Sequence, residues 1–250
     1  MDTISHHFAA PDGQRLTWHE MAEGMPVLLL HGLFSSAFIN WVRYGHAEAI
    51  AAHGKRVIML DHRAHGDSAK PHDPAAYPND VLTTDALALV RHLDLSDYDL
   101  VGYSLGARTA ARMIGKGAAP RRLVLAGMGL EGLVGTSGRA DHFRYILTNL
   151  GKHERGSPEW MAEAFLKTTK GDPEALLLLL DSWGDVSEAD LTRITMPTLV
   201  VAGAEDQDNG SAPALAGRLP NATYQEVPGG HMSSVTKPEL GVAIASFLGA

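Results

Sequence analysis

Short, mostly apolar runs recur along the chain, and segments with helical spacing separate them. Examples are PVLLLHG (26–32), RVIMLD (56–61), RRLVLAG (121–127) and, much later, TLVVAG (198–203). Strands that are apolar throughout are typical of a parallel sheet buried on both faces, and helices usually connect such strands. The sequence therefore predicts an α/β fold around an open, mostly parallel sheet.

The remaining strand and helix signals bring the expected sheet to about eight strands. ISHHFAA (4–10) and QRLTWHEM (14–21) flank a Pro-Asp-Gly turn, which predicts a hairpin at the start of the chain. Further strands are expected at DYDLVGYS (97–104) and TYQEVP (223–228). Helices are expected over 81–93, directly after Ser104, over 211–219 and over 238–248.

The alternation of strands and helices fails between Met128 and about Ile194. This segment begins glycine-rich and then has helical spacing, with several aromatic residues. A loop of that length without structure of its own would be unusual. We therefore predict a core made of 1–127 and 195–250, with 128–194 inserted as a helical cap over the sheet.

Composition narrows the classes of partner and compartment. The 250 residues carry a formal net charge of −8 without a basic run, which argues against nucleic acid and anionic membranes. Cysteine is absent, and the longest aliphatic run, ALLLLL (175–180), is too short to span a bilayer. The N-terminal residues lack the pattern of a secretory signal. We expect a cytoplasmic protein that acts on a small molecule without cofactor or metal, as a monomer or homodimer.

One serine stands between two glycines at the end of an expected strand, in Gly102-Tyr103-Ser104-Leu105-Gly106. The strand before it and the helix after it are the context expected of a nucleophile elbow. Such a serine occupies a strained turn in which neighbouring backbones pass closely, a role for glycine. The hydroxyl then stands at a helix N-terminus, where developing negative charge is favoured.

Four further motifs follow expected strands in a fixed order. They are His31-Gly32, the loop DHRAHGDS (61–68), Gly203-Ala204-Glu205-Asp206 and Pro228-Gly229-Gly230-His231. Together with the serine motif, they make the sequence resemble the α/β-hydrolase fold family over nearly the whole chain, although Ala64 stands where that family usually has glycine. The resemblance implies an eight-stranded, mostly parallel sheet flanked by helices.

The order Ser104, Asp206, His231 is the one in which this fold carries its catalytic triad. A serine hydroxyl becomes a nucleophile when a histidine takes its proton, and a carboxylate fixes the tautomer of that histidine. Glu205 and Asp208 share the loop with Asp206, and the spacing from the preceding glycine favours Asp206 as the acid.

The resemblance also implies an oxyanion hole and a substrate pocket. The backbone N–H groups of Leu33 and Leu105 would stabilise the negative charge of the reaction intermediate. Phe34, Met128 and Trp183 are the expected pocket residues. With these apolar side chains, a small to medium apolar ester fits the pocket better than a highly charged substrate.

The leading hypothesis is a carboxylesterase-like serine hydrolase that acts through an acyl-enzyme intermediate. The same triad supports lactone, thioester or carbon–carbon bond hydrolysis, perhydrolysis and hydroxynitrile cleavage. A non-catalytic ligand receptor on this fold is a further alternative. A metal site at His62 and His65, beside Asp61, is the least favoured, because the fold already explains that loop.

Overall fold

An eight-stranded sheet forms the centre of the computed structural model, which describes residues 2–135 and 137–250. The strands lie in the order β1-β2-β4-β3-β5-β6-β7-β8, in which β1, β2 and β4 pair antiparallel and the others pair in parallel. Their bounds are β1 Ile4–Ala9, β2 Arg15–Met21, β3 Met25–Leu30, β4 Lys55–Leu60, β5 Asp99–Tyr103, β6 Leu123–Ala126, β7 Thr198–Gly203 and β8 Ala222–Val227. The predicted fold class and all eight predicted strands are confirmed.

Successive side chains of the central strands enter two different hydrophobic cores. In β3, Leu28 and Leu30 belong to one core, whereas Val27 and Leu29 belong to the other. All four are fully buried. Because side chains alternate across a strand, a strand covered by helices on both faces must be apolar at every position. This burial explains the uninterrupted apolar runs of the sequence.

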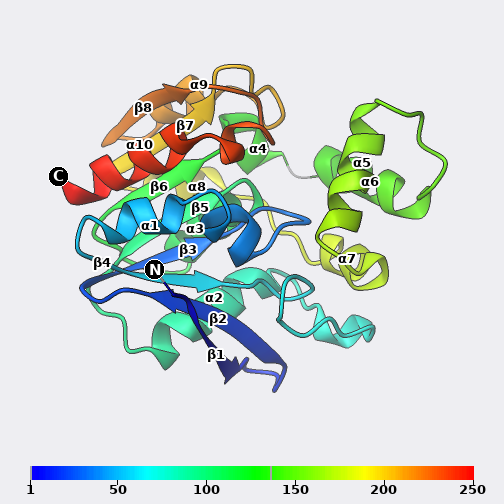
Figure 1. Cartoon of the computed structure of the whole chain (residues 1–250), viewed down its shortest axis with the longest axis horizontal. Coiled ribbons are helices and arrows are strands. Elements are labelled where there is room, and N and C mark those ends of the chain that lie inside the picture. Colours follow the sequence, from blue (N-terminus) through cyan, green and yellow to red (C-terminus); the bar gives the residue numbers. More distant parts are fainter. Residues whose placement is uncertain (1, 136) are drawn as a thin grey trace.

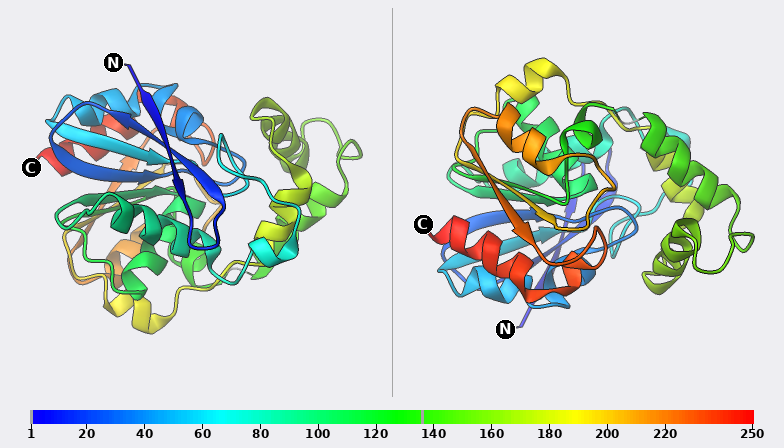
Figure 2. Two further views of the ribbon diagram at one scale, coloured as in Figure 1. Left: turned by 90° about the horizontal axis from the view of Figure 1, so that it is seen from below. Right: turned by 90° about the horizontal axis from the view of Figure 1, so that it is seen from above.

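Helices cover both faces of the sheet (Figure 2). On one face α1 packs against α10, whereas α2, α3, α8 and α9 supply the core of the opposite face. The helices of the described residues are α1 His46–Ala51, α2 Val81–His92, α3 Leu105–Gly115, α4 Leu130–Val134, α5 Ser137–Thr148, α6 Pro158–Thr168, α7 Pro173–Leu180, α8 Glu188–Thr192, α9 Ala212–Arg218 and α10 Pro238–Gly249, with short helical turns η1 Phe38–Val42, η2 Pro74–Ala76 and η3 Ser234–Thr236.

In its described residues, the segment predicted as a cap contains the helices α4 to α8, which loops connect. Only α5, α6 and α7 stand away from the sheet as a separate group (Figure 1), whereas α4 contacts α9 and α8 contacts α3. One face of α7, with Leu176 and Leu179, is buried in the same cluster as Phe34 and Leu105. Because both ends of the inserted segment pack on the core, the boundaries of the cap at 128 and 194 remain predictions.

Among the described residues, the structure contains no helix with the length and apolarity needed to cross a bilayer.

Candidate active site

Ser104 lies at the turn between β5 and α3 with a strained backbone. Its φ of 53° and ψ of −113° are rare for a residue with a side chain. A Cβ at Gly102 would lie 2.2 Å from the Gly106 carbonyl oxygen, and a Cβ at Gly106 would lie 2.0 Å from that of Leu30. Both glycines are therefore required by close backbone contacts. The turn leaves the Ser104 side chain partly exposed at the N-terminus of α3.

Two loops at the carboxyl ends of β7 and β8 bring Asp206 and His231 to this serine. His231 Nε2 lies 3.0 Å from Ser104 Oγ, and His231 Nδ1 lies 2.9 Å from Asp206 Oδ2. Because an ionised carboxylate only accepts hydrogen bonds, Nδ1–H is the donor to Asp206. Nε2 of the neutral ring is then free to accept the serine proton.

Asp206 is held ionised in this position. Burial raises the pKa of its carboxyl group, but the hydrogen bond and charge of His231, with the Asp208 N–H and the charge of Arg139, lower that pKa below its ordinary value. Asp208 itself points elsewhere, since its carboxylate lies 3.8 Å from the Arg139 guanidinium. Of the carboxylates in this loop, Asp206 is the one that the structure places against His231.

Direct contacts between the two loops fix the distance from Asp206 to His231. A Cβ at Gly203 would lie 2.0 Å from the Gly229 carbonyl oxygen, and the Glu205 N–H donates to that same oxygen at 3.0 Å. Tyr103 also fixes the loop that carries His231, because its hydroxyl donates to the His231 carbonyl. Tyr103 occupies a variable position of the serine motif, so the motif carries no signal of this role.

The predicted oxyanion donors lie on either side of Ser104. Leu105 is the first residue of α3, where a helix leaves its N–H groups without intrahelical partners. In the described loops and helix ends, the N–H groups of Leu33 and Leu105 donate to no backbone carbonyl. A Cβ at Gly32 would lie 3.5 Å from Ser104 Cβ, so the Leu33 loop runs directly beside Ser104. Both N–H groups thus border the space in front of Ser104.

His31 braces this loop, as expected for a hydrogen-bonded structural residue. Its Nδ1 donates to the Gly32 carbonyl at 2.8 Å, and its Nε2 accepts the His62 N–H at 3.0 Å. His65 Nε2 accepts the Phe34 N–H at 3.2 Å. These buried histidines hold the loops after β3 and β4 together. Of the two histidines of the metal alternative, His65 has both ring nitrogens engaged, since its Nδ1 donates to the Arg63 carbonyl at 3.0 Å. Neither ring nitrogen of His62 has a hydrogen-bond partner among the described residues.

The loop after β4 contains two further structural features. Arg63 is 1% exposed and forms ion pairs with Asp12 and Asp85, which ties the β1–β2 turn to α2. Ala64, at the position where the resembling family usually has glycine, adopts a left-handed φ of 68°. Arg63 is thus a structural charge that ties this loop to its neighbours.

Comparison with known proteins agrees with this geometry. A family model described as the alpha/beta hydrolase fold matches residues 25–132. An esterase from Exiguobacterium antarcticum superposes with a TM-score of 0.81 at 18% identity, over 99% of this chain and 100% of that one. The chain has the α/β-hydrolase fold.

Two curated relatives resemble this α/β-hydrolase along most of its length. It is 32% identical, over 91% of its residues, to the dihydrolipoyllysine-residue acetyltransferase component of the acetoin cleaving system of Pseudomonas putida, and it spans only 64% of that protein. It is 29% identical to a non-heme chloroperoxidase of Kitasatospora aureofaciens, over 78% of this chain and 79% of that one.

A small cavity of the α/β-hydrolase opens directly beside Ser104. The space between its lining atoms, including the open mouth, is about 240 Å³. Met128 and Trp183 line it, as expected, but Phe34 does not. The Phe34 ring is 3% exposed and packs edge-on against Phe143, a lining residue from α5, at 5.4 Å between centroids. Phe34 therefore lies behind the cavity wall.

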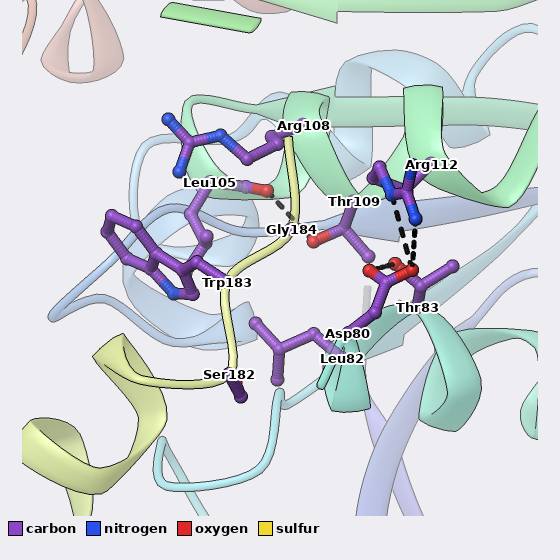
Figure 3. A pocket seen from close by; sticks show the side chains of 10 residues that line it. All are labelled: Asp80, Leu82, Thr83, Leu105, Arg108, Thr109, Arg112, Ser182, Trp183 and Gly184. Carbon is purple, nitrogen blue, oxygen red and sulfur yellow. Dashed lines mark hydrogen bonds and ion pairs between the residues drawn. The ribbon is translucent and has the colours of Figure 1, made fainter. Parts of the chain in front are cut away.

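Two arginines that the sequence did not predict as pocket residues also line this cavity. Arg108 comes from α3 and Arg139 from α5. A second cavity lies on the other side of Arg108 and Trp183 (Figure 3), and its far wall is the ion pair between Arg112 and Asp80. Two guanidinium groups therefore border the pocket beside its apolar side chains.

Proposed function

We propose that this α/β-hydrolase is a serine hydrolase that cleaves a small to medium carboxylic ester through an acyl-enzyme intermediate. The observation that supports the proposal is the unbroken chain of hydrogen bonds from Asp206 through His231 to Ser104. A serine, a neutral histidine and an ionised carboxylate in this order form the arrangement that activates a hydroxyl for acyl transfer. The structural similarity to an esterase is consistent with it.

In the first half of the proposed reaction, His231 Nε2 takes the Ser104 proton while Oγ attacks the ester carbonyl carbon. The carbonyl oxygen becomes an oxyanion that the N–H groups of Leu33 and Leu105 stabilise. His231 then returns the proton to the departing alkoxide, and the acyl group remains on Ser104. The buried carboxylate of Asp206 balances the charge on the imidazolium in this step.

In the second half, water replaces the alcohol. His231 takes a proton from that water, the hydroxide attacks the acyl-enzyme carbonyl, and the proton passes to Ser104 Oγ as the ester bond to the enzyme breaks. The products are a carboxylic acid, an alcohol and the regenerated enzyme.

The experiment is hydrolysis of 4-nitrophenyl butyrate by the wild type, Ser104→Ala and the matched control Ser96→Ala, an exposed serine before β5. We expect loss of Ser104 to lower kcat on the order of 10⁶-fold, and the control to remain within about 3-fold of the wild type. A wild type that binds esters without turning them over would favour the receptor alternative instead.

A further inference from the structure

Arg108 brings an unusual buried charge to the cavity beside Ser104. It lies one helical turn after Ser104 on α3, and it is only 5% exposed. One of its guanidinium nitrogens donates to the Gly132 carbonyl at 2.8 Å. Its Nε is buried and has no hydrogen-bond partner among the described residues. A buried donor without an acceptor is energetically costly, so Arg108 Nε is a candidate to donate to a ligand.

The charge of Arg108 is also poorly compensated by the protein. Within the described part of the chain, no carboxylate approaches it to ion-pair distance, and its guanidinium lies 4.7 Å from the centre of the Trp183 ring. Burial and the charge of Arg139 lower the pKa of Arg108 to about 10, while the more distant charge of Asp185 raises it. Arg108 thus lines the cavity as a cation without a carboxylate partner among the described residues.

Arg112, on the same helix, has the carboxylate partners that Arg108 lacks. One turn after Arg108, it forms ion pairs at 2.8 Å with both Asp80 and Asp190. In Figure 3 the Arg112 guanidinium points to Asp80, whereas that of Arg108 extends away from Arg112, on the side of Trp183. The helix itself thus does not prevent an arginine from forming ion pairs, and Arg108 lacks a carboxylate partner because of its position at the cavity beside Ser104.

Arg139 adds a second cation from the opposite wall of this cavity. Its guanidinium lies 5.0 Å from the centre of the Phe143 ring, and it forms an ion pair with the half-exposed Asp208 at 3.8 Å. Burial lowers the pKa of Arg139, and the charges of Asp208 and Asp206 raise it in part. Apart from these two arginines, the wall is largely apolar, with Leu33, Leu105, Met128 and Phe143.

We propose that Arg108 and Arg139 bind a carboxylate of the substrate, so that the natural substrate is a small ester that also carries a carboxylate near its scissile bond. A carboxylate matches the planar donors of a guanidinium and offers the acceptor that Arg108 Nε lacks. The apolar wall accommodates the short carbon chain between the two groups. This inference rests on the proposed esterase function and defines its substrate class.

The test compares two esters of similar size in a pH-stat assay of acid release. Monoethyl succinate carries the carboxylate, and ethyl butyrate has a methyl group in its place. We expect the wild type to have a kcat/KM at least about 10-fold higher on monoethyl succinate, since hydrogen bonds to charged groups are the stronger class.

Arg108→Gln is the informative variant, because glutamine retains an N–H for the Gly132 carbonyl but removes the charge. We expect it to lower kcat/KM about 10- to 100-fold on monoethyl succinate and less than about 3-fold on ethyl butyrate. Arg139→Gln, at a more exposed position, should act in the same direction. The matched control is Arg144→Gln, also on α5, whose guanidinium pairs with Asp181 at the surface at 2.6 Å; it should change neither value.

Two results would overturn the inference. One is a wild type that prefers ethyl butyrate. The other is an Arg139→Gln or Arg108→Gln protein, folded by circular dichroism, in which kcat/KM falls equally for both esters.

A binding measurement separates this inference from the proposed function. Calorimetric titration of Ser104→Ala with monoethyl succinate reports recognition without turnover. Tighter binding than that of ethyl butyrate, lost in the Ser104→Ala, Arg108→Gln double variant, supports the carboxylate site even if the wild type hydrolyses neither ester. Hydrolysis of ethyl butyrate without selective binding of monoethyl succinate would leave the proposed function standing and reject the carboxylate site.

Discussion

The hydroxyl of Tyr103 donates a hydrogen bond to the backbone carbonyl of His231, and it lies 3.1 Å from Ser234 Oγ. Tyr103 directly precedes Ser104, so the end of β5 supports both Ser104, the proposed nucleophile, and the loop of His231, the proposed general base. The Tyr103 ring is buried, and burial raises the pKa of its hydroxyl, which keeps the group protonated as a donor.

Tyr103→Phe should therefore lower kcat by about 10-fold and leave KM nearly unchanged, because a loosened His231 reaches the reactive geometry less often. The free energy of unfolding should fall by about 1–3 kcal/mol, the cost of an unsatisfied buried carbonyl. Steady-state kinetics and urea unfolding measure both effects.

Tyr77→Phe is the matched control for this prediction. It removes a similar hydrogen bond, from a buried tyrosine to the Pro71 carbonyl at 2.8 Å, away from the triad. It should reduce stability without the loss in kcat. Equal kcat values in Tyr103→Phe and the wild type would show that the contact has no positioning role.

Asp206→Asn should lower kcat on the order of 10⁴-fold, because an amide favours the wrong tautomer of His231. Asp208→Asn should remain within about 3-fold of the wild type on a neutral ester, since Asp208 contacts Asp206 through its backbone N–H alone. The measurement is kcat on 4-nitrophenyl butyrate at pH 7.5. If the two variants exchanged these effects, the acid would be Asp208.

Acid pH should destabilise the protein through its buried histidines. Burial lowers the pKa of His31 and His62, and it lowers that of His65 to about 3. As the pH falls below about 6.5, the unfolded chain binds protons at these rings before the folded chain does, and for His65 this difference extends to about pH 3. The free energy of unfolding therefore falls as the pH falls, by about 1.4 kcal/mol per pH unit for each ring that is protonated in the unfolded chain and neutral in the folded chain.

His62→Leu tests this effect with little loss of hydrogen bonding, since neither ring nitrogen of His62 has a partner among the described residues. Between pH 7.5 and pH 5.0 its free energy of unfolding should fall by about 2 kcal/mol less than that of the wild type. His53→Gln, at an exposed histidine on the surface after α1, should behave like the wild type. An unchanged pH dependence in His62→Leu would contradict the linkage.

The sheet could be predicted because its signal is local. Each central strand is buried on both faces, so burial appears directly as an apolar run, and the positions of Ser104, Asp206 and His231 follow from the strand ends. The packing of the capping segment could not be predicted in the same way. Whether α4 and α8 pack on the core or join α5–α7 depends on contacts with α9 and α3, which no local pattern encodes.

Arg108 shows why the pocket was only partly predictable. An arginine on an amphipathic helix is typical of a solvated face. Its burial arises from Trp183, which is distant in the sequence and reaches it only in the folded chain. Phe34 shows the opposite case, since its position beside the oxyanion loop suggested the pocket, whereas Phe143 covers its ring.

Covalent labelling of Ser104 tests the account most directly. The protein is treated with a neutral alkyl fluorophosphonate. The mass of the intact protein is then measured, followed by the masses of its tryptic peptides. We predict one adduct per chain, carried by the tryptic peptide 92–108. Fragment ions should assign it to Ser104 and not to Ser96. The Ser104→Ala variant should carry no adduct. An unmodified wild type, or an adduct that persists in Ser104→Ala, would contradict the proposal that Ser104 is the nucleophile.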